Sequence, residues 1–365
     1  MFISLLISNS LFCGLAILCF IPILNSTQNL NYKNRILILI LFFMLSIRLL
    51  FPFELPFTKT VGESLILPKV IELMDYRVFN IAGIKILMLV TYIIIVVILL
   101  TKATYKHIKL SHVLSIVPVT ENRDVLNMVD KICKYENIKN IPKVICVDID
   151  TGAFIFGCRK PIIVLSPKLS KEKQKMILLH EIQHLKLKHL PIKILLELIF
   201  IIYWWFPLIW LLKKEVLKML ELQADVYAVR TLSDREKNKY TEVLFSLAKN
   251  NFKHIDTTCS LLFISSLNTL EYRIKNLLKV IYGVRKRLYI AEVLCVACLS
   301  TLIMMSCLYT FEAYYYSIKL EESFMITDNS YFRINDENEY ELYVNEKYQC
   351  TLSHIPKELI SLEIK

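Results

Sequence analysis

The helix and the metal site that this sequence predicts both depend on one stretch, Met176-Ile-Leu-Leu-His180-Glu181-Ile-Gln-His184. Its two histidines are four residues apart, and positions i and i+4 of an α-helix lie on the same face. His180 and His184 are therefore predicted to present two imidazole nitrogens to one metal ion. The four residues before His180 are all apolar, which indicates a helix that is buried where it leads into the site.

Glu181 follows the first histidine and lies about 100° further round the helix. Its carboxylate is predicted to reach a metal-bound water rather than the metal itself. Zinc lowers the pKa of such a water to about 7, and a carboxylate at hydrogen-bond distance can accept its proton. The stretch therefore predicts zinc chemistry with Glu181 as general base. A surface helix with two solvated histidines is the alternative interpretation.

A third metal ligand is expected downstream. The residue six positions after the second histidine is Leu190, which excludes a short three-histidine pattern, and His189 is interpreted as a polar residue at a helix end. Glu221 in Glu221-Leu-Gln-Ala-Asp225 is the preferred candidate. Asp225 shares its helix face and would accept the free ring N–H of a liganding histidine, which orients that imidazole. The rival carboxylates on spacing alone are Glu215 and Glu197.

The composition indicates a membrane protein. Of the 365 residues, 55% are hydrophobic, whereas ordinary soluble domains have about 45–50%. About 20 apolar residues are needed for one membrane crossing. Transmembrane helices are predicted over residues 2–24, 36–53, 84–100 and 288–311. The first of them lacks a charged region and a small-residue cleavage site, so it is interpreted as a retained helix.

The distribution of charge predicts the orientation of these helices. Residues 101–287 contain 32 Lys and Arg against 17 Asp and Glu, while residues 312–365 contain 5 against 11. Basic residues mark the cytoplasmic ends of membrane helices. Residues 101–287 are thus expected in the cytoplasm, and the amino terminus, the loop 54–83 and the tail 312–365 outside the cell membrane. The dispersed basic charge favours contact with anionic lipid over direct nucleic-acid binding.

A further apolar run covers residues 190–212. A single crossing there would put Glu221 outside and His180 inside, and one ion cannot be bound from both faces of a bilayer. Trp204-Trp205-Phe206-Pro207 combines interfacial aromatic residues with a helix breaker. The run is therefore predicted to be a re-entrant hairpin or an interfacial helix pair, unless Glu221 is not a ligand.

The rest of the cytoplasmic block predicts an α+β domain. Apolar residues recur at helical spacing over residues 120–137, and Ser170 precedes a helix that contains both histidines. Residues 144–148 and 161–165 are short β-branched runs, and either could supply an edge strand for an extended substrate. In the tail, residues 331–334, 340–344 and 348–352 alternate and predict a small β-meander.

Together these motifs resemble the BlaR/MecR-type membrane metallopeptidases, the antirepressor proteases known from beta-lactam sensing. The resemblance covers about residues 140–279. It is carried by Gly157 with Arg159-Lys-Pro-Ile-Ile-Val-Leu-Ser-Pro167, His180-Glu-Ile-Gln-His184, Trp205-Phe-Pro-Leu-Ile-Trp210, Glu221-Leu-Gln-Ala-Asp225 and Leu270-Glu-Tyr-Arg-Ile-Lys275. It implies a multi-pass α-helical membrane protein with an inserted zincin-like (gluzincin) domain. It also implies His180, His184 and Glu221 as Zn²⁺ ligands, Glu181 as base and Asp225 as the partner of a ligand.

The sequence departs from that family at several points. His189 stands where such proteins often have Asp, and Phe206 meets Pro207 where Trp-Phe-Asn-Pro is common. The beta-lactam sensors carry a large penicillin-binding domain after the last span, whereas only residues 312–365 follow it here. Beta-lactam sensing by this chain alone is therefore not expected.

The expected function is that of a zinc endopeptidase that transduces a signal by cleaving itself or a cytoplasmic repressor, for which a winged-helix protein is a candidate. A dimer is one option for its assembly. Two alternatives stay open, a membrane quality-control metalloprotease and a receptor or scaffold with structural zinc and no proteolysis. An open coordination position distinguishes catalytic from structural zinc. Tyr227 and Arg230 are candidates for the group that stabilises the oxyanion.

Overall fold

The computed structural model describes residues 2–25, 32–54, 56–63, 68–69, 77–78, 82–149, 153–251, 267–282, 289–313, 330–335, 339–352 and 362–364. Two compact units are present, one of Met1–Val61 with Glu72–Glu312 and one of Gly62–Ile71 with Ala313–Lys365. Much of the predicted loop 54–83 and the junction at residues 283–288, between the predicted cytoplasmic domain and the fourth span, lie outside the described residues.

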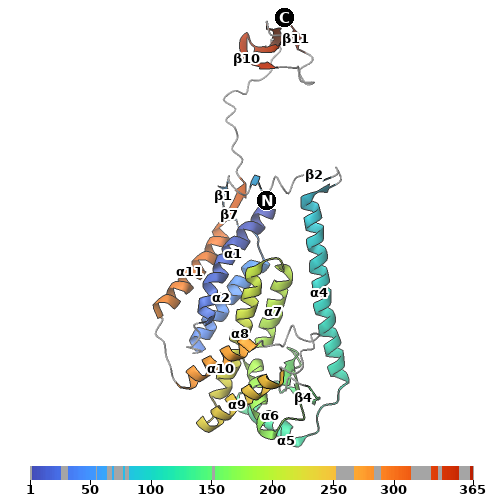
Figure 1. The fold of residues 1–365 in the computed structure, drawn as a ribbon, viewed down its shortest axis with the longest axis vertical. Coiled ribbons are helices and arrows are strands. Elements are labelled where there is room, and N and C mark those ends of the chain that lie inside the picture. The colour runs from blue at the N-terminus through green and yellow to red at the C-terminus, as the bar shows by residue number, and fades with distance from the viewer. Residues whose placement is uncertain are drawn as a thin grey trace. The chain divides into compact units, whose positions relative to one another are not determined.

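Long helices make up most of the first unit (Figure 1). They are α1 (Phe2–Asn25), α2 (Tyr32–Leu50), α4 (Ile84–Ile116), α5 (Arg123–Tyr135), α6 (Lys171–Lys186), α7 (His189–Ile202), α8 (Pro207–Val229), α9 (Asp234–Asn251), α10 (Leu267–Ile281) and α11 (Tyr289–Leu308). One apolar core joins α1, α2 and α11 to the α7–α8 pair. A second core surrounds α6 and joins it to α5, the far end of α8, α9 and α10.

The helices over the predicted spans differ from the prediction at their ends. α2 stops at Leu50 instead of residue 53, and α11 stops at Leu308 instead of residue 311. The chain after α11 forms strand β7 (Tyr309–Ala313), which pairs with β1 (Lys59–Glu63). α4 continues to Ile116, far beyond residue 100, because residues 101–116 contain no Gly or Pro and the first proline comes at Pro118.

One described helical segment, Ile86–Ile116, is long and apolar enough to cross a membrane, and its most apolar stretch is not buried against the rest of the unit. Three further apolar segments, Ser8–Leu24, Ile36–Leu50 and Val293–Leu308, are shorter.

The apolar run 190–212 forms two helices. α7 ends at Ile202, residues 203–206 turn, and Pro207 begins α8. Proline is favoured at the first position of a helix, whereas within one continuous helix its ring would clash with the carbonyl of Tyr203. The two helices lie side by side (Figure 1) and are joined by ion pairs Lys193–Glu221 and Lys213–Glu197. Those pairings match an antiparallel hairpin.

A three-stranded sheet lies beside α6. Its order is β4 (Lys143–Cys146), β6 (Ile162–Leu165) and β5 (Ala153–Phe156), with β4 parallel and β5 antiparallel to β6. The prediction that residues 161–165 could supply an edge strand is wrong, because β6 is the central strand. β5 was not predicted as a strand. Among the described strands it has one neighbour, and it packs against α6.

Gly157 makes the turn from β5 to β6 possible. Its φ is +88°, and a Cβ at this position would lie 2.6 Å from the carbonyl oxygen of Lys160. Only glycine adopts this backbone conformation without strain. The sheet is followed by α6, whose first turn is capped by Ser170 Oγ, which accepts a hydrogen bond from the Lys173 amide at 3.4 Å.

The second unit contains a small sheet in the order β10 (Lys347–Leu352), β9 (Tyr340–Val344), β8 (Ser330–Ile334) and β11 (Glu363–Ile364). The first three strands form an antiparallel meander, as the alternation predicts, and β11 adds a parallel strand that was not predicted. Asn345 and Glu346 both have positive φ, as a two-residue hairpin turn requires. In the first unit, β2 (Arg77–Val78) pairs with β3 (Ala82–Gly83).

Candidate metal centre

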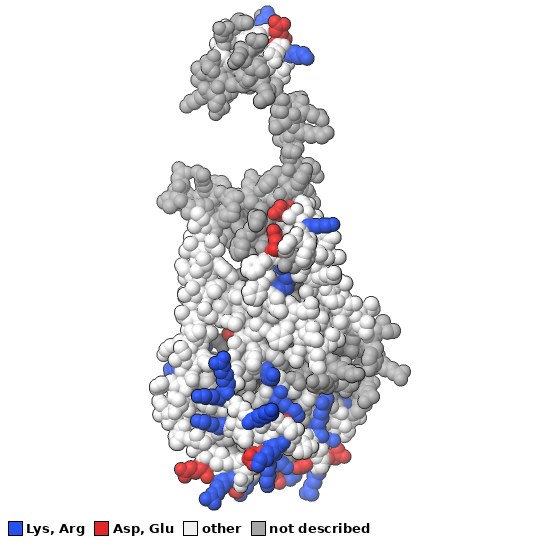
Figure 2. Space-filling model, turned by 180° about the vertical axis from the view of Figure 1, so that it is seen from behind, with Lys and Arg blue, Asp and Glu red and all other residues white. Residues whose placement is uncertain are grey.

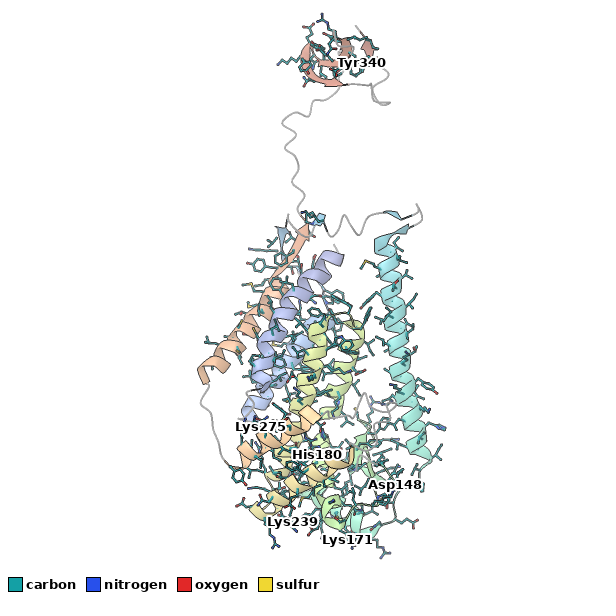
Figure 3. The ribbon with its side chains drawn as sticks, in the orientation of Figure 1. Asp148, Lys171, His180, Lys239, Lys275 and Tyr340 are labelled. Atoms are coloured by element: carbon teal, nitrogen blue, oxygen red, sulfur yellow. The ribbon has the colours of Figure 1, made fainter. Side chains whose placement is uncertain are left out.

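α6 carries His180 and His184 on its buried side. Only 9% of His180 and 3% of His184 is exposed. Their Nε2 atoms are 3.2 Å apart. Figure 3 shows His180 among the helices of the first unit, whereas Lys171 and Lys239 lie at its outer edge. The surface helix with two solvated histidines, the alternative considered from sequence, is therefore wrong.

Glu221 reaches the two histidines from α8. Its Oε2 is 3.5 Å from His180 Nε2, and its Oε1 is 3.7 Å from His184 Nε2. One ligand atom from each of the three residues can be chosen so that all lie within 4.8 Å of one another. Two nitrogen ligands at about 2.0–2.1 Å from a tetrahedral zinc would be about 3.3 Å apart. The donor set therefore fits a single ion of this kind.

The two rival carboxylates are engaged elsewhere in the hairpin. Glu215 accepts from Lys218 and Glu197 accepts from Lys213, each at 2.6 Å. Glu221 is the carboxylate that the helix reversal at Pro207 brings back to α6.

Asp225 lies behind His180 and is fully buried. Its Oδ1 is 3.0 Å from His180 Nδ1, and the Tyr240 hydroxyl donates to the same oxygen at 2.8 Å. Arg273 donates from Nε to Oδ2 at 2.7 Å and from Nη2 to Oδ1 at 2.8 Å. This bidentate pair holds Asp225 beside the ring nitrogen that faces away from Glu221, so that Nε2 of His180 points into the cluster.

The charges around His180 are strongly coupled. Burial alone would raise the pKa of Asp225, but the charge and hydrogen bonds of Arg273 lower it well below its usual range. Burial would likewise lower the pKa of His180, but its hydrogen bond and charge interaction with Asp225 raise it to about 9. Without a metal ion, His180 is therefore stabilised as a cation, and metal binding must release its proton.

Tyr240 and Arg273 were not assigned a role from the sequence. Arg273 stands in the Leu270–Lys275 motif that carries part of the resemblance, and this motif was the available signal. Tyr240 comes from the middle of α9, and nothing in the sequence around it distinguishes it from a core tyrosine.

Glu181 is partly exposed on α6, next to His180. Burial is the largest influence on its carboxyl group and raises the pKa to about 7; the charge of His180 lowers it and that of Glu221 raises it. A carboxyl group with a pKa near neutrality can both accept and release a proton at physiological pH.

His189 occupies the far side of His184. It is the first residue of α7, as a helix-end residue would be, but it is completely buried. Its Nδ1 is 2.9 Å from His184 Nδ1. Burial lowers the pKa of His184 to about 4, so this imidazole is neutral and in the protonation state that binds a metal.

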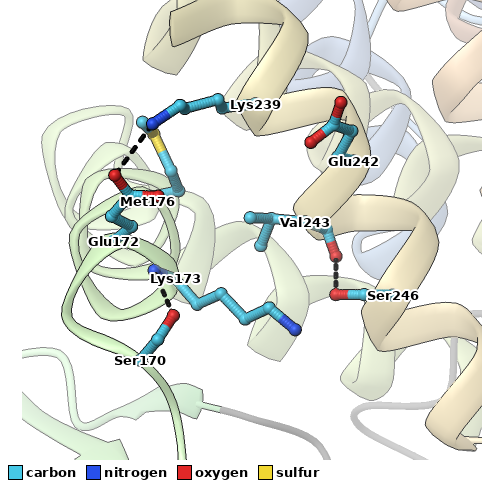
Figure 4. Close-up of a pocket in the computed structure, with 8 residues that line it drawn as sticks. All are labelled: Ser170, Glu172, Lys173, Met176, Lys239, Glu242, Val243 and Ser246. Carbon is cyan, nitrogen blue, oxygen red and sulfur yellow. Dashed lines mark hydrogen bonds and ion pairs between the residues drawn. The ribbon is translucent and has the colours of Figure 1, made fainter.

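A pocket of about 320 Å³ opens elsewhere, between the start of α6 and α9 (Figure 4). It is lined by Ser170, Glu172, Lys173, Met176, Lys239, Glu242, Val243 and Ser246. None of these residues belongs to the His–His–Glu cluster. Lys239 pairs with Glu172 at 2.8 Å across this pocket.

A helix with two facing histidines, a carboxylate returned by a second helix and an edge strand beside the first helix together resemble the layout of a metallopeptidase. A family model described as BlaR1 peptidase M56 matches residues 56–277, more than half of the chain. The chain belongs to this peptidase family, which confirms the resemblance found from its motifs. It is also 28% identical over 188 residues to "Regulatory protein BlaR1" of Bacillus licheniformis.

That alignment covers 50% of this chain and 31% of the relative. The chain thus spans about a third of the length of the curated relative it matches.

Proposed function

We propose that this protein is a membrane-embedded zinc endopeptidase. His180, His184 and Glu221 would hold Zn²⁺, and Glu181 would act as general base. The observation that carries the proposal is the approach of the Glu221 carboxylate to both Nε2 atoms, at 3.5 and 3.7 Å, beside a glutamate whose pKa is raised to about 7. Asp225 would orient His180 from behind.

When bound, zinc would supply a Lewis acid and a water of lowered pKa. Glu181 would accept the proton of that water as the water oxygen attacks the peptide carbonyl carbon. Glu181 would then pass the proton to the amide nitrogen as the C–N bond breaks. No covalent intermediate with the protein is required.

The substrate would bind in extended form along β5. This strand contacts α6, and among the described strands it pairs on one side only. An extended peptide can add to such an edge through main-chain hydrogen bonds. β4 is less suited, because the carbonyl of Val144 already accepts from the Thr120 amide at 2.9 Å.

A multi-pass arrangement in the cell membrane is part of the proposal. The apolar residues of α4 are exposed along the helix, with Leu87 64% and Ile94 52% exposed. On the face drawn in Figure 2, the middle of the first unit is a band with few charged side chains, and Lys and Arg gather below it. The α7–α8 hairpin would enter the bilayer and return, with residues 101–287 in the cytoplasm and the tail outside.

The biological role would be signal transduction, by cleavage of the protein itself or of a cytoplasmic repressor of the winged-helix type. The relative is named a regulatory protein, and this supports a regulatory role here. Broad cleavage of unfolded membrane proteins would instead support the quality-control alternative.

Substitution Glu181→Gln tests the enzyme proposal. The variant should bind zinc with unchanged affinity, because Glu181 is not a ligand, and its peptide-bond hydrolysis should fall by about 10²–10⁴-fold because the base is lost. Zinc affinity can be measured by competition with a chromophoric chelator and hydrolysis with labelled casein. Retained hydrolysis in the variant would refute the role of Glu181, and zinc binding without hydrolysis in the wild type would favour the scaffold alternative.

A further inference from the structure

Arg273 Nη1 lies 3.6 Å from Oε2 of the candidate ligand Glu221, and a second cation, Lys193 on α7, lies against the same carboxylate. The Nζ of Lys193 donates to Glu221 Oε1 at 3.1 Å. Its side chain is 19% exposed, close to the 21% of Glu221 itself. Both side chains are therefore partly accessible to solvent, whereas only 3% of His184 is exposed and Asp225 is fully buried.

Arg273 is more enclosed than Lys193, with 8% against 19% of its side chain exposed, and its other donors are bound to Asp225. Arg273 directs Nε and Nη2 to Asp225, and the Tyr240 hydroxyl donates to that same carboxylate. Arg230 lies over the ring of Tyr227, with its guanidinium carbon 4.2 Å from the ring centre. Tyr227 and Arg230, the two residues that the sequence suggested for stabilising the oxyanion, thus contact each other, whereas Lys193 contacts the cluster.

The hairpin fixes Lys193 in this position. His189, Lys193 and Glu197 recur every four residues and so share one face of α7. They contact His184, Glu221 and Lys213, respectively. The face of α7 that packs on α8 therefore carries a polar stripe through an otherwise apolar helix, and its middle member meets the candidate centre.

We propose that Lys193 stabilises the oxyanion that forms on the substrate during hydrolysis; this inference rests on the proposed function. An ammonium group has three donors, so one bond to Glu221 leaves others for the carbonyl oxygen of a peptide. As the water oxygen bonds to the carbonyl carbon, the π electron pair of the carbonyl group moves onto the carbonyl oxygen. Lys193 donates a hydrogen bond to this carbonyl oxygen. Lys193 keeps its proton throughout, and the C–N bond breaks when Glu181 protonates the leaving nitrogen.

A merely structural role makes a different prediction. If Lys193 only neutralises Glu221 until an ion binds, its loss should change zinc affinity and leave the rate of the zinc-saturated protein intact. If it stabilises the oxyanion, its loss should reduce the rate and the binding of tetrahedral anions at full zinc occupancy. Preorganised donors of this kind contribute about 10²–10³-fold to kcat.

The test compares Lys193→Met and Lys193→Arg in the full-length chain, with Lys213→Met as matched control. Lys213 forms the other α7–α8 ion pair, at 2.6 Å with Glu197. Three quantities are measured: zinc affinity by chelator competition, binding of phosphoryl-leucine amide by calorimetry at saturating zinc, and casein hydrolysis. The phosphoryl group is a tetrahedral anion that resembles the oxyanion.

For Lys193→Met we expect kcat to fall about 10²–10³-fold, with a comparable loss of affinity for phosphoryl-leucine amide and no loss of zinc affinity. Lys193→Arg should recover part of kcat and part of the affinity for phosphoryl-leucine amide. Lys213→Met should change neither kcat nor that affinity. Normal phosphoryl-leucine amide binding and normal kcat in Lys193→Met would overturn the role of Lys193 while leaving the proposed function intact. A wild type that binds zinc but neither hydrolyses casein nor binds the anion would overturn both.

Discussion

Asp225 and Arg273 form a buried ion pair, with Asp225 fully enclosed and 7% of Arg273 exposed. Burying a charge is costly, and the pair is stable only while both partners remain. Because Asp225 also contacts His180 Nδ1 at 3.0 Å, the pair links the stability of the fold to the orientation of a candidate metal ligand.

Substitution Asp225→Asn should therefore have two separable effects. It removes the bidentate counter-charge of buried Arg273 and leaves only the longer contact of its Nη1 with Glu221, at 3.6 Å, which should destabilise the protein by up to about 3–5 kcal/mol. It also weakens the hydrogen bond that orients His180, which should lower zinc affinity by about 10–100-fold. Thermal unfolding and chelator competition measure the two effects.

The double variant Asp225→Asn with Arg273→Met is the control. Removing the second charge should restore most of the stability, since no unpaired ion is then buried, but it should not restore zinc affinity. If both quantities recover together, Asp225 acts on the centre only through the fold, and its proposed orienting role is wrong.

Much of the candidate site could be predicted at this scale because its core is local. The i, i+4 spacing predicts that His180 and His184 face one ion, and the same spacing between Glu221 and Asp225 predicts that both could serve one site. Arg273 and Tyr240 could not be found in this way. Arg273 is 48 residues from Asp225, which it contacts, and Tyr240 is 60 residues from His180, which it contacts. Both come from other helices than their partners.

At the scale of elements, the α7–α8 hairpin determines whether a single metal centre can form. A helix break at Pro207 predicts that the chain turns back, and α8 does begin at this residue. β5 was missed because its sequence, Ala153-Phe-Ile-Phe, contains a single β-branched residue, whereas residues 144–148 and 161–165 each contain three. The burial of His189 was also missed, since it follows from the sharp turn at Lys188, where φ is +55°, and not from a residue pattern.

The hairpin makes a topology prediction. Lys188 and Lys214 are exposed at the two ends of the proposed re-entrant pair. After Lys188→Cys and Lys214→Cys are introduced singly into a chain without other cysteines, both should react with a membrane-impermeant maleimide from the cytoplasmic side only. Labelling is measured in inside-out and right-side-out vesicles.

Cys158 serves as the reference, because it is exposed in the same block of the chain, between β5 and β6. A variant that keeps only this native cysteine should label from the same side as the two engineered positions. Labelling of positions 188 and 214 from opposite sides would mean that residues 190–212 cross the membrane once, which is incompatible with a shared ion.

At the scale of the whole first unit, a buried polar network joins the turn of the hairpin to the apolar helices. Arg48 on α2 donates from Nε to Ser306 Oγ on α11 at 3.0 Å, and from Nη1 to the carbonyl of Phe53 at 2.9 Å. Next to it, the Tyr203 hydroxyl at the hairpin turn donates to the carbonyl of Leu49 at 2.7 Å. Asn9 on α1 donates to the carbonyl of Arg48 at 3.3 Å. Sequence patterns recognised each of these helices as apolar but could not show that they share polar contacts.

Substitution Arg48→Met should loosen this assembly while preserving its apolar volume. It leaves the buried acceptor on Ser306 unsatisfied, at a cost of about 1–3 kcal/mol, which should lower Tm. A local readout is available because Cys19 Sγ on α1 and Cys298 Sγ on α11 are 3.5 Å apart. Oxidative cross-linking of this pair should be slower in Arg48→Met than in the wild type. Since α11 packs on α1 along its length, unchanged Tm and unchanged cross-linking would mean that apolar packing alone holds these helices together and that the Arg48 contacts contribute nothing to their association.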